Sequence, residues 1–376
     1  MSDTRLHVLH VYKDVYPTVV GGIERHIDDL RRSLPDARSD VLVCSRSMRT
    51  RRFQTPYGTE VHVGQLGRIL SAPFAPRFPV SLRRHRAALL HVHMPNPTGE
   101  ASALLARREI PLVASYHADI VRQQALRPLY APLVNRLLRR ASAIVVGAHA
   151  TLRQSEFLAA HREKVRVIPY GVDTDRFDSA RADPERVAAI RDELGSPLVA
   201  ATGRLVYYKG FDLLIEAVHG MDASVVIIGG GPLQGKLRVL AASNPRVTVT
   251  GLVSEQRLVD LLAAADCFAL PSTSRAESFG IATVEAQAMG LPAIVADVGT
   301  GTTEAIDPGV TGIVISPGDV TALRAAIEQL LGDDEQRARM SAAASERARA
   351  TLSLKVMAET VRGLYEEVLA DAGYGS

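Results

Sequence analysis

The chain has 376 residues, of which 47% are hydrophobic and 23% are charged. This length exceeds what one hydrophobic core comfortably supports, and the composition is that of a globular protein, so extensive disorder is excluded and two domains are expected. Its two cysteines, Cys44 and Cys267, belong to no CxxC pair. This argues against a disulfide framework and a structural zinc site, and it fits a reducing cytoplasm.

The net charge of +3 hides a difference between the two halves of the chain. Residues 1–172 carry 26 lysines and arginines against 13 acidic residues, whereas residues 173–376 carry 18 against 28. Three basic clusters lie in the first half: Arg49, Arg51 and Arg52; Arg83, Arg84 and Arg86; and Arg136, Arg139 and Arg140. They indicate either a solvated arginine-rich surface or a contact with an anionic membrane or a diphosphate lipid. Nucleic acid is a less favoured partner, because the chain has no Trp and the clusters lack interleaved aromatic residues for base stacking.

No segment of the sequence reaches the roughly 18 uncharged apolar residues that a membrane-spanning helix needs. The first apolar run is seven residues long before charge returns, which is too short for a signal peptide. We therefore expect a soluble cytoplasmic protein, either free or attached to the inner face of the cell membrane.

Residues 1–172 alternate short apolar runs with helical patterns. The runs are nearly continuous in Val, Ile and Leu, as in buried parallel strands, and they fall at residues 6–12, 40–44, 89–94, 111–117 and 143–148. Helical patterns lie between them, at residues 23–34, 102–108 and 126–140. This alternation predicts an α/β domain with a parallel sheet and helices on both faces.

Small and polar residues follow several of these strands. Gly21 and Gly22 precede a helix, where backbone N–H groups can approach a diphosphate closely, although Gly-Gly before a helix is a weak signal by itself. His93 ends one strand and His117 ends another, where Asp119 follows it. Zinc is disfavoured, because no carboxylate or cysteine stands at convincing ligand spacing from these histidines or from His91. We expect His93 and His117 to be polar groups at the floor of a cleft, with His117 the stronger candidate.

The strand and helix alternation restarts after residue 172. Strands are expected at residues 197–205, 224–231, 246–251, 267–271 and 292–297, and helices at residues 211–220, 255–265 and 277–289. A second doubly wound domain therefore spans residues 173–355, and ligands should bind at the carboxyl ends of its strands, in a cleft that faces the first domain. The tail from residue 322 is helical, and its last helix, at about residues 356–376, is expected to pack back on the first domain.

Four charged residues of the second domain follow predicted strands or lie on a helix. Arg204 and Lys209 come directly after a strand, where two cations could neutralise charge that develops on a leaving diphosphate. Glu277 and Glu285 flank the start of a helix at residues 278–281, where free backbone N–H groups are available. This arrangement suits a phosphorylated polyol, with one glutamate at each end. For the two cations, solvated loop positions are the alternative.

Two motifs resemble known binding patterns but fail in detail. The segment GGGPLQGKL has Gln234 where a dinucleotide fingerprint has its last glycine, and Leu237 where a P-loop has the magnesium-binding Ser or Thr. We therefore interpret Gly230 and Gly231 as a glycine turn near a nucleotide. Asp173 and Asp175 form a DxD between the two halves, where a helix start or a hinge explains them better than a metal.

Six segments in this order resemble the family 4 retaining glycosyltransferases of GT-B fold: GGIE, SYHADI, PYGVD, GRLVYYKG, GGGPL and ESFGIATVEAQAMGLP. The resemblance covers almost the whole chain. It implies two Rossmann-like domains, with the acceptor on the side of residues 1–172 and a nucleotide-sugar donor bound by residues 173–355. It also implies transfer of a hexose with retained anomeric configuration and without a metal or other cofactor.

The resemblance also assigns roles to the candidate residues. Arg204 and Lys209 would hold the donor diphosphate, assisted by the segment Ser278, Phe279, Gly280 and Ile281, and Gly21 and Gly22 would border it from the other domain. Glu277 would bind the hexose hydroxyls and Glu285 the ribose, while His117 would contact the sugar near its anomeric centre. The implied mechanism is front-face displacement, in which the leaving phosphate oxygen helps to deprotonate the acceptor. Glu277 would then position and stabilise the sugar rather than attack it, unlike the paired acids of retaining glycosidases.

Within that family, the segments HMPNP, SYHADIVRQ and GTGT look most like bacterial polysaccharide mannosyl- and rhamnosyltransferases. This favours a GDP-sugar such as GDP-mannose as donor, with a UDP-sugar second, and a polyprenyl-diphosphate-linked saccharide as acceptor in lipopolysaccharide or exopolysaccharide synthesis. Loops at residues 46–58 and 67–79 are expected to form the acceptor site. The alternatives are transfer from a UDP-sugar to a soluble acceptor and a non-catalytic nucleotide-sugar-binding partner. Near Glu304 the chain departs from the commonest family pattern, which leaves the role of that residue open.

Overall fold

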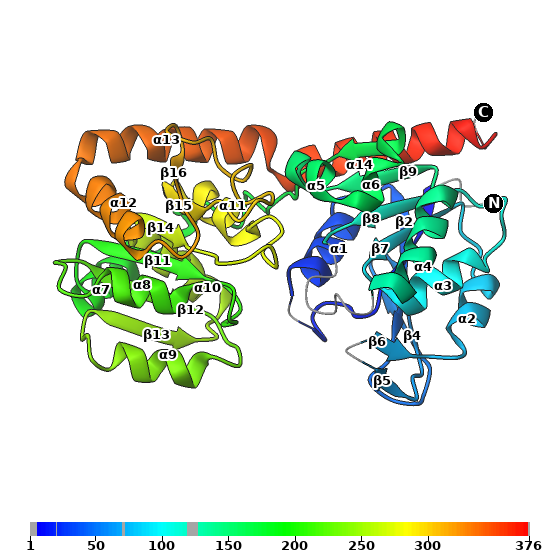
Figure 1. Cartoon of the computed structure of the whole chain (residues 1–376), viewed down its shortest axis with the longest axis horizontal. Coiled ribbons are helices and arrows are strands. Elements are labelled where there is room, and N and C mark those ends of the chain that lie inside the picture. Colours follow the sequence, from blue (N-terminus) through cyan, green and yellow to red (C-terminus); the bar gives the residue numbers. More distant parts are fainter. Residues whose placement is uncertain (1–5, 20, 70–71, 119–126, 375–376) are drawn as a thin grey trace. The chain divides into compact units, whose positions relative to one another are not determined.

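A computed structural model describes residues 6–19, 21–69, 72–118 and 127–374 (Figure 1). The chain forms two compact units. Unit 1 comprises Met1–Tyr170 together with Leu354–Ser376, and unit 2 comprises Gly171–Ser353. Each unit has its own parallel sheet flanked by helices (Figure 1).

The sheet of unit 1 has eight strands in the order β10-β9-β8-β7-β1-β2-β4-β3. Their bounds are β1 Leu6–Val11, β2 Ala37–Cys44, β3 Arg51–Thr55, β4 Gly58–Val63, β7 Leu89–Met94, β8 Leu112–Tyr116, β9 Ala143–Val146 and β10 Val165–Val167. All neighbouring pairs are parallel except β3 and β4. Because β2 follows β1 on one side and β7 lies on the other, the strand order reverses between β1 and β7.

Helices cover both faces of this sheet. They are α1 Gly22–Arg32, α2 Phe78–Arg84, α3 Pro97–Leu104, α4 Arg127–Arg140, α5 His149–Gln154, α6 Glu156–Ala159 and α14 Leu354–Asp371. Neighbouring residues of β1 point to opposite faces: Leu9 packs in one core with residues of α2, α3 and α4, and Val8 packs in the other with residues of α1 and α14. The helix α14 therefore completes the hydrophobic core of unit 1, and its Tyr365 is fully buried.

The segments expected to be loops of the acceptor site contain strands, so the expectation of loops was wrong, while their role toward an acceptor stays a prediction. Strands β3 and β4 form a hairpin within residues 51–63, and a second hairpin joins β5 Gly67–Ile69 to β6 Ala72–Phe74. Alternation in GTEVHV is a strand signal, and Gly58, with φ of +149°, begins β4 directly after the turn. Its position is demanding, because a Cβ there would lie 2.5 Å from Asp40 Oδ1.

The sheet of unit 2 has six parallel strands in the order β13-β12-β11-β14-β15-β16. Their bounds are β11 Leu198–Thr202, β12 Ser224–Ile228, β13 Val247–Gly251, β14 Cys267–Leu270, β15 Ala293–Ala296 and β16 Gly312–Ile315. The helices are α7 Pro184–Leu194, α8 Phe211–Ala217, α9 Gln234–Ala241, α10 Glu255–Ala264, α11 Ile281–Ala288, α12 Val320–Gly332 and α13 Asp334–Thr351. The order runs outward from β11 through β12 to β13 and then resumes at β14, so it reverses between β11 and β14.

The helix expected over residues 277–289 begins later than predicted. Its first residue is Ile281, and Gly280 before it has the left-handed φ of 82°. A residue in that conformation cannot belong to the interior of a right-handed helix, and glycine adopts it at little cost. Glu277 therefore precedes α11 and Glu285 lies on it.

Candidate active site

The point where the strand order of unit 2 reverses is the natural place for a ligand, because the loops after the two central strands diverge there. Strands β11 and β14 are neighbours, with Val199 opposite Cys267 in the ladder. The loop after β11 carries Arg204 and Lys209, and the loop after β14 carries Glu277. Topology thus brings together three residues that the sequence analysis singled out separately.

Lys209 and Glu277 form a buried ion pair at this point. Lys209 Nζ lies 2.5 Å from Glu277 Oε2, and each side chain is only 10% exposed. The other carboxylate oxygen, Glu277 Oε1, accepts a hydrogen bond of 3.1 Å from the backbone N–H of Gly280. Glu277 is thereby fixed between a cation and the first turn of α11, where the helix dipole also favours a negative charge.

The turn that leads into α11 directs backbone rather than side chains toward the site. The side chain of Phe279 is 1% exposed and belongs to the core. The carbonyl of Ser278 accepts a hydrogen bond of 2.9 Å from Gly301 N–H. Ile281 opens the helix with a half-buried side chain. For residues 278–281, the backbone is therefore the part that can meet an anionic ligand at the helix start.

Arg204 and Glu285 occupy less enclosed positions. Arg204 is exposed and Glu285 is half-buried on α11. The phenol of Tyr208 reports on the charges around it: burial raises its pKa to about 12, Glu277 adds to the rise and Arg204 opposes it. Arg204 and Glu277 therefore both act electrostatically on Tyr208. Glu285 lies on α11, in its second turn.

The glycines after β12 allow two loops to pack closely. The N–H of Leu205 donates to the carbonyl of Gly230 over 3.0 Å. A Cβ on Gly229 would lie 2.0 Å from the carbonyl oxygen of Gly203, and one on Gly231 would lie 2.5 Å from that of Leu205. These glycines are therefore needed for the packing that holds the loop of Arg204.

The P-loop-like segment and the DxD motif have structural roles. Leu237 of the first is 1% exposed in the core, and Asp173 Oδ1 of the second accepts the N–H of Arg176 at a turn.

In unit 1, five buried histidines lie at and near the reversal between β1 and β7. We call them the buried histidine cluster: His10, His26, His91, His93 and His117. His10 Nδ1 lies 3.1 Å from His93 Nε2, and His93 Nδ1 lies 3.0 Å from His117 Nε2. The chain of hydrogen bonds ends at Tyr170, whose hydroxyl is 2.7 Å from His117 Nδ1.

Burial keeps this cluster neutral. Desolvation is the largest cause for each member, and it lowers the pKa of His26 to about 4 and that of His91 to about 3. It holds the pKa values of His10, His93 and His117 well below their usual range, and neighbouring histidines lower them further. A neutral imidazole donates one hydrogen bond and accepts one, so the cluster is a hydrogen-bonding network without charge.

His10 and His26 were not predicted as members of this cluster, and zinc was disfavoured for its other three histidines. His10 was treated as part of a strand and His26 as part of a helix. The ring nitrogens of His10, His91 and His93 lie within 4.8 Å of one another, a spacing that a metal ion could use. His91, however, uses both ring nitrogens, 2.5 Å from the Tyr365 hydroxyl and 2.7 Å from Ser115 Oγ. A metal would have to displace one of these partners.

The remaining candidates of unit 1 lie near the start of α1. Gly21 is the N-cap of the helix and Gly22 is its first residue, exposed to solvent. A Cβ on Gly21 would lie 2.3 Å from Glu24 Oε2, so glycine leaves room for that side chain. Asp119, expected beside His117, lies outside the described residues. Among the helices that the structure describes, none is both long enough and apolar enough to cross a membrane.

The sequence matches two family models, "Glycosyltransferase Family 4" over residues 20–176 and "Glycosyl transferases group 1" over residues 185–347. It is 33% identical over 352 residues to the D-rhamnosyltransferase WbpZ of Pseudomonas aeruginosa, which covers 92% of this chain and 91% of the relative. It is 32% identical over 339 residues to the O-antigen chain mannosyltransferase C of Escherichia coli, covering 88% of this chain and 90% of the relative.

Solved structures share the fold. Sucrose-phosphate synthase from Thermosynechococcus elongatus superposes with a TM-score of 0.79 at 19% identity, covering 98% of this chain and 100% of that one. HepE of Anabaena, solved in complex with UDP, has a TM-score of 0.79 at 22% identity and covers 96% and 100%. These glycosyltransferases have the GT-B fold, which confirms the expected architecture of two Rossmann-like domains. Together with the family models and the relatives, the match confirms the sequence resemblance: this chain belongs to the family 4 glycosyltransferases.

Proposed function

We propose that the protein is a retaining, metal-independent hexosyltransferase that moves mannose from GDP-mannose to a polyprenyl-diphosphate-linked saccharide. The observation that carries the proposal is the Lys209–Glu277 pair, 2.5 Å apart at the strand reversal of unit 2 and directly before the first turn of α11. A diphosphate needs cations and free backbone N–H groups, and a hexose needs a carboxylate that accepts from its hydroxyls. These groups meet there.

The residues of this site would divide the donor between them. Arg204 and Lys209 would neutralise the charge that grows on the leaving diphosphate, which is the electrostatic task of such a reaction. The backbone of residues 278–281 would assist them. Glu277 would accept hydrogen bonds from the hexose, and Glu285 from the ribose. Because Glu277 is already paired with Lys209, donor binding would bring the hexose and the diphosphate to the two ends of an existing ion pair.

Three groups of unit 1 would complete the proposal. Gly21 and Gly22 would let backbone approach the diphosphate, and His117 would contact the sugar near its anomeric centre. Both ring nitrogens of His117 are already bonded, to His93 and to Tyr170, so His117 would contact a sugar hydroxyl by exchanging one of these bonds. Burial keeps its pKa well below the usual range, so it would make that contact as a neutral group. Proton removal from the acceptor would fall to the leaving phosphate oxygen in a front-face displacement.

The choice of donor and acceptor draws on relatives and on charge. Two relatives that align with nearly the whole chain are named as a D-rhamnosyltransferase and an O-antigen chain mannosyltransferase. A more distant relative, from Corynebacterium glutamicum, is named as GDP-mannose-dependent. The excess of basic residues in the first half suits an acceptor that carries a diphosphate near an anionic membrane. Localisation at the inner face of the cell membrane follows from that acceptor and is part of the proposal.

A UDP-sugar with a soluble acceptor is the second candidate, since a structural neighbour of 21% identity was solved with UDP-glucose. Calorimetric titration of GDP-mannose and UDP-glucose decides between the two donors, and extraction of the product into the organic or aqueous phase decides between the acceptors. The configuration of the anomeric proton in the product, read by NMR, tests retention. Full activity in excess EDTA tests metal independence.

Substitution of the two glutamates tests the site itself. Glu277→Gln should lower turnover by at least about tenfold while the nucleotide dissociation constant changes little, because its contact is with the sugar rather than the nucleotide. Glu285→Ala should instead raise the dissociation constant of the donor. Glu335→Gln, on an exposed side chain of α13, is the matched control and should change neither quantity. Unchanged turnover in Glu277→Gln would exclude the assignment, and absence of donor hydrolysis by the native protein would favour a non-catalytic binding partner.

A further inference from the structure

A second polar site lies in unit 1, near the amino ends of its central strands. It is distinct from the buried histidine cluster. His7 is the second residue of β1 and Arg38 the second residue of β2. Together with α2 and the residues after it they line an open cavity of about 310 Å³. Its lining consists mainly of basic side chains: His7, Arg38, Arg52, Arg84, His85 and Arg86. In parallel strands the amino ends lie at the opposite edge from the carboxyl ends, so this cavity is separate from the strand reversal that carries the buried histidine cluster.

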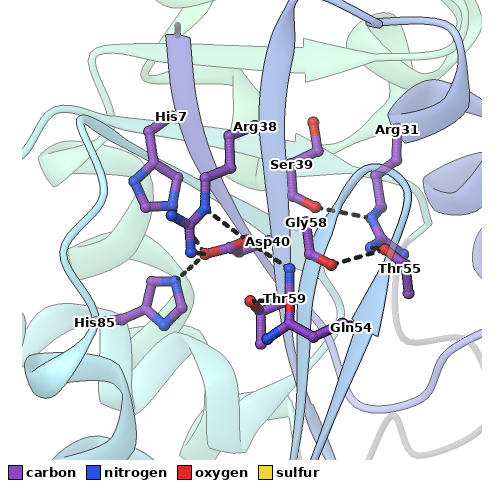
Figure 2. Close-up of polar contacts among 10 residues, drawn as sticks. All are labelled: His7, Arg31, Arg38, Ser39, Asp40, Gln54, Thr55, Gly58, Thr59 and His85. Atoms are coloured by element: carbon purple, nitrogen blue, oxygen red, sulfur yellow. Dashed lines mark hydrogen bonds and ion pairs between the residues drawn. The ribbon is translucent and has the colours of Figure 1, made fainter. Parts of the chain in front are cut away.

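A buried carboxylate organises the cavity (Figure 2). The side chain of Asp40 has no exposed surface, and its Oδ2 lies 2.9 Å from His7 Nε2 and 2.7 Å from His85 Nε2. Arg38 donates to both carboxylate oxygens, over 3.2 Å and 3.1 Å, and the N–H of Thr59 donates to Oδ1 over 2.7 Å. Burial opposes ionisation of Asp40, but these hydrogen bonds outweigh it and hold its pKa well below the usual range. Asp40 therefore fixes His7, His85 and Arg38 as an ionised anchor.

The cavity holds more positive charge than Asp40 can balance. Arg52, Arg84 and Arg86 are exposed at its rim, and none of them forms an ion pair with a carboxylate in the described part of the chain. They come from two of the basic clusters of the sequence, which the fold brings together around one hollow. Guanidinium groups converging from a strand, a helix and a loop can bind several oxygens of one tetrahedral anion.

The same residues offer a metal site, and the charges decide against it. One ring nitrogen each of His7 and His85 and an oxygen of Asp40 lie within 4.8 Å of one another. Arg38, however, already donates to both oxygens of Asp40, so a divalent cation would have to lie beside a guanidinium group. The cation and the guanidinium group of Arg38 would repel each other, whereas an oxyanion is attracted by every arginine of the rim.

We propose that this cavity binds a phosphate or diphosphate group, either on a soluble metabolite or on a lipid headgroup. Its volume of about 310 Å³ exceeds that of a single phosphate, which leaves room for the group that carries it. The proposal does not rest on the proposed function, because every residue of the cavity lies in unit 1 and the donor cations Arg204 and Lys209 lie in unit 2. It assigns a binding role to Arg52, Arg84 and Arg86 in place of a merely solvated surface.

Calorimetric titration with inorganic diphosphate tests the proposal on the full chain. The Arg204→Gln background removes an exposed cation of the donor site, so that diphosphate binding in unit 2 is weakened. In that background, Arg84→Gln with Arg86→Gln should weaken diphosphate binding by at least about tenfold, since each charge-assisted hydrogen bond is worth about a factor of ten or more. Arg83→Gln is the matched control, because Arg83 is exposed next to Arg84 but does not line the cavity. Arg52→Gln, on a different element, should repeat the effect and guard against a local change in α2.

A second arm identifies the source of the phosphate. Vesicles of phosphatidylglycerol are compared with vesicles of phosphatidylcholine in a sedimentation assay with the same variants. Loss of binding to the anionic vesicles in parallel with loss of diphosphate binding assigns a lipid phosphate. Loss of diphosphate binding alone assigns a soluble ligand. The proposal is overturned if Arg83→Gln weakens diphosphate binding as much as the cavity variants, if diphosphate does not bind at millimolar concentration, or if only Zn²⁺ binds and His85→Gln abolishes that binding.

Discussion

Lys209→Met should destabilise unit 2, because it removes the cation from a carboxylate that is largely shielded from water. The two side chains are each 10% exposed and lie 2.5 Å apart. Loss of one partner of such a pair typically costs about 3–5 kcal/mol, since the other charge remains buried without compensation. Methionine keeps most of the length and apolar surface of the lysine stem, so the loss of packing stays small.

Proton uptake sets an upper limit on this cost. An ordinary glutamate titrates near pH 4.3, so protonating one at pH 7 costs about 3.7 kcal/mol. Because protonation of Glu277 is always open to the variant, we expect a loss of about 3 kcal/mol at pH 7, within that limit. At pH 5 the same limit falls to about 1 kcal/mol. The difference in unfolding free energy between Lys209→Met and the native chain should shrink accordingly as the pH falls.

Urea denaturation followed by far-UV circular dichroism at pH 7 and pH 5 measures these differences, analysed as two transitions because the chain has two compact units. Glu277→Gln combined with Lys209→Met should recover most of the loss, because no buried charge remains. The double-variant cycle isolates the pair. Our reasoning is refuted if the single variant loses less than about 1 kcal/mol at pH 7, if the loss is independent of pH, or if the two substitutions are additive.

Two further outcomes are expected. First, the buried histidine cluster is neutral in the fold but takes up protons on unfolding below about pH 6.5. The cluster therefore makes its full contribution to the unfolding free energy of unit 1 above that pH. The contribution falls at lower pH by up to about 1.4 kcal/mol per pH unit for each histidine. Glu100, whose pKa burial raises to about 7, opposes this by one comparable contribution. The urea midpoint of unit 1 should fall between pH 7 and pH 5, more than that of unit 2, which has His219 as its one histidine; an equal or higher midpoint at pH 5 would contradict this. Second, Gly280→Ala should lower the melting temperature and weaken donor binding, because its φ is 82° and the new Cβ would lie 3.2 Å from Leu270 Cδ2. Gly235→Ala, on a helix with nothing within 4 Å, is the control and should lower neither quantity, because alanine is the better helix former; equal losses at the two glycines would sink the explanation.

The strands and the two-sheet architecture could be predicted because buried parallel strands are almost purely apolar. The order of the strands could not, since it depends on which apolar faces meet after the chain has folded. The hairpin of β3 and β4 was missed for a related reason. Strand β3 has a single apolar residue and is exposed along most of its length, so the segment resembles a polar loop, although β4 alternates.

The residues of the candidate site were predicted as groups around one donor, but the direct contact between two of them was not. Lys209 and Glu277 were each named, yet their contact depends on β11 and β14 being neighbours, which no local pattern reveals. His10 was missed because a histidine inside an apolar run reads as part of the strand. The register of β1 with β7 places His10 opposite His91, and that pairing joins strands far apart in the sequence.

The two strand reversals of this protein carry different chemistry, and this difference bears on how the proposed roles are divided. At the reversal in unit 2, the polar side chains Lys209 and Glu277 are charged and compensate each other. At the reversal in unit 1, the buried histidines are kept neutral and bind one another and Tyr170. A neutral network can still donate hydrogen bonds to a developing negative charge, but it adds no positive charge to the site. The positive charge that compensates the leaving diphosphate is therefore expected from unit 2, whereas His117 in unit 1 would offer a neutral hydrogen bond in exchange for one that it makes to His93 or Tyr170.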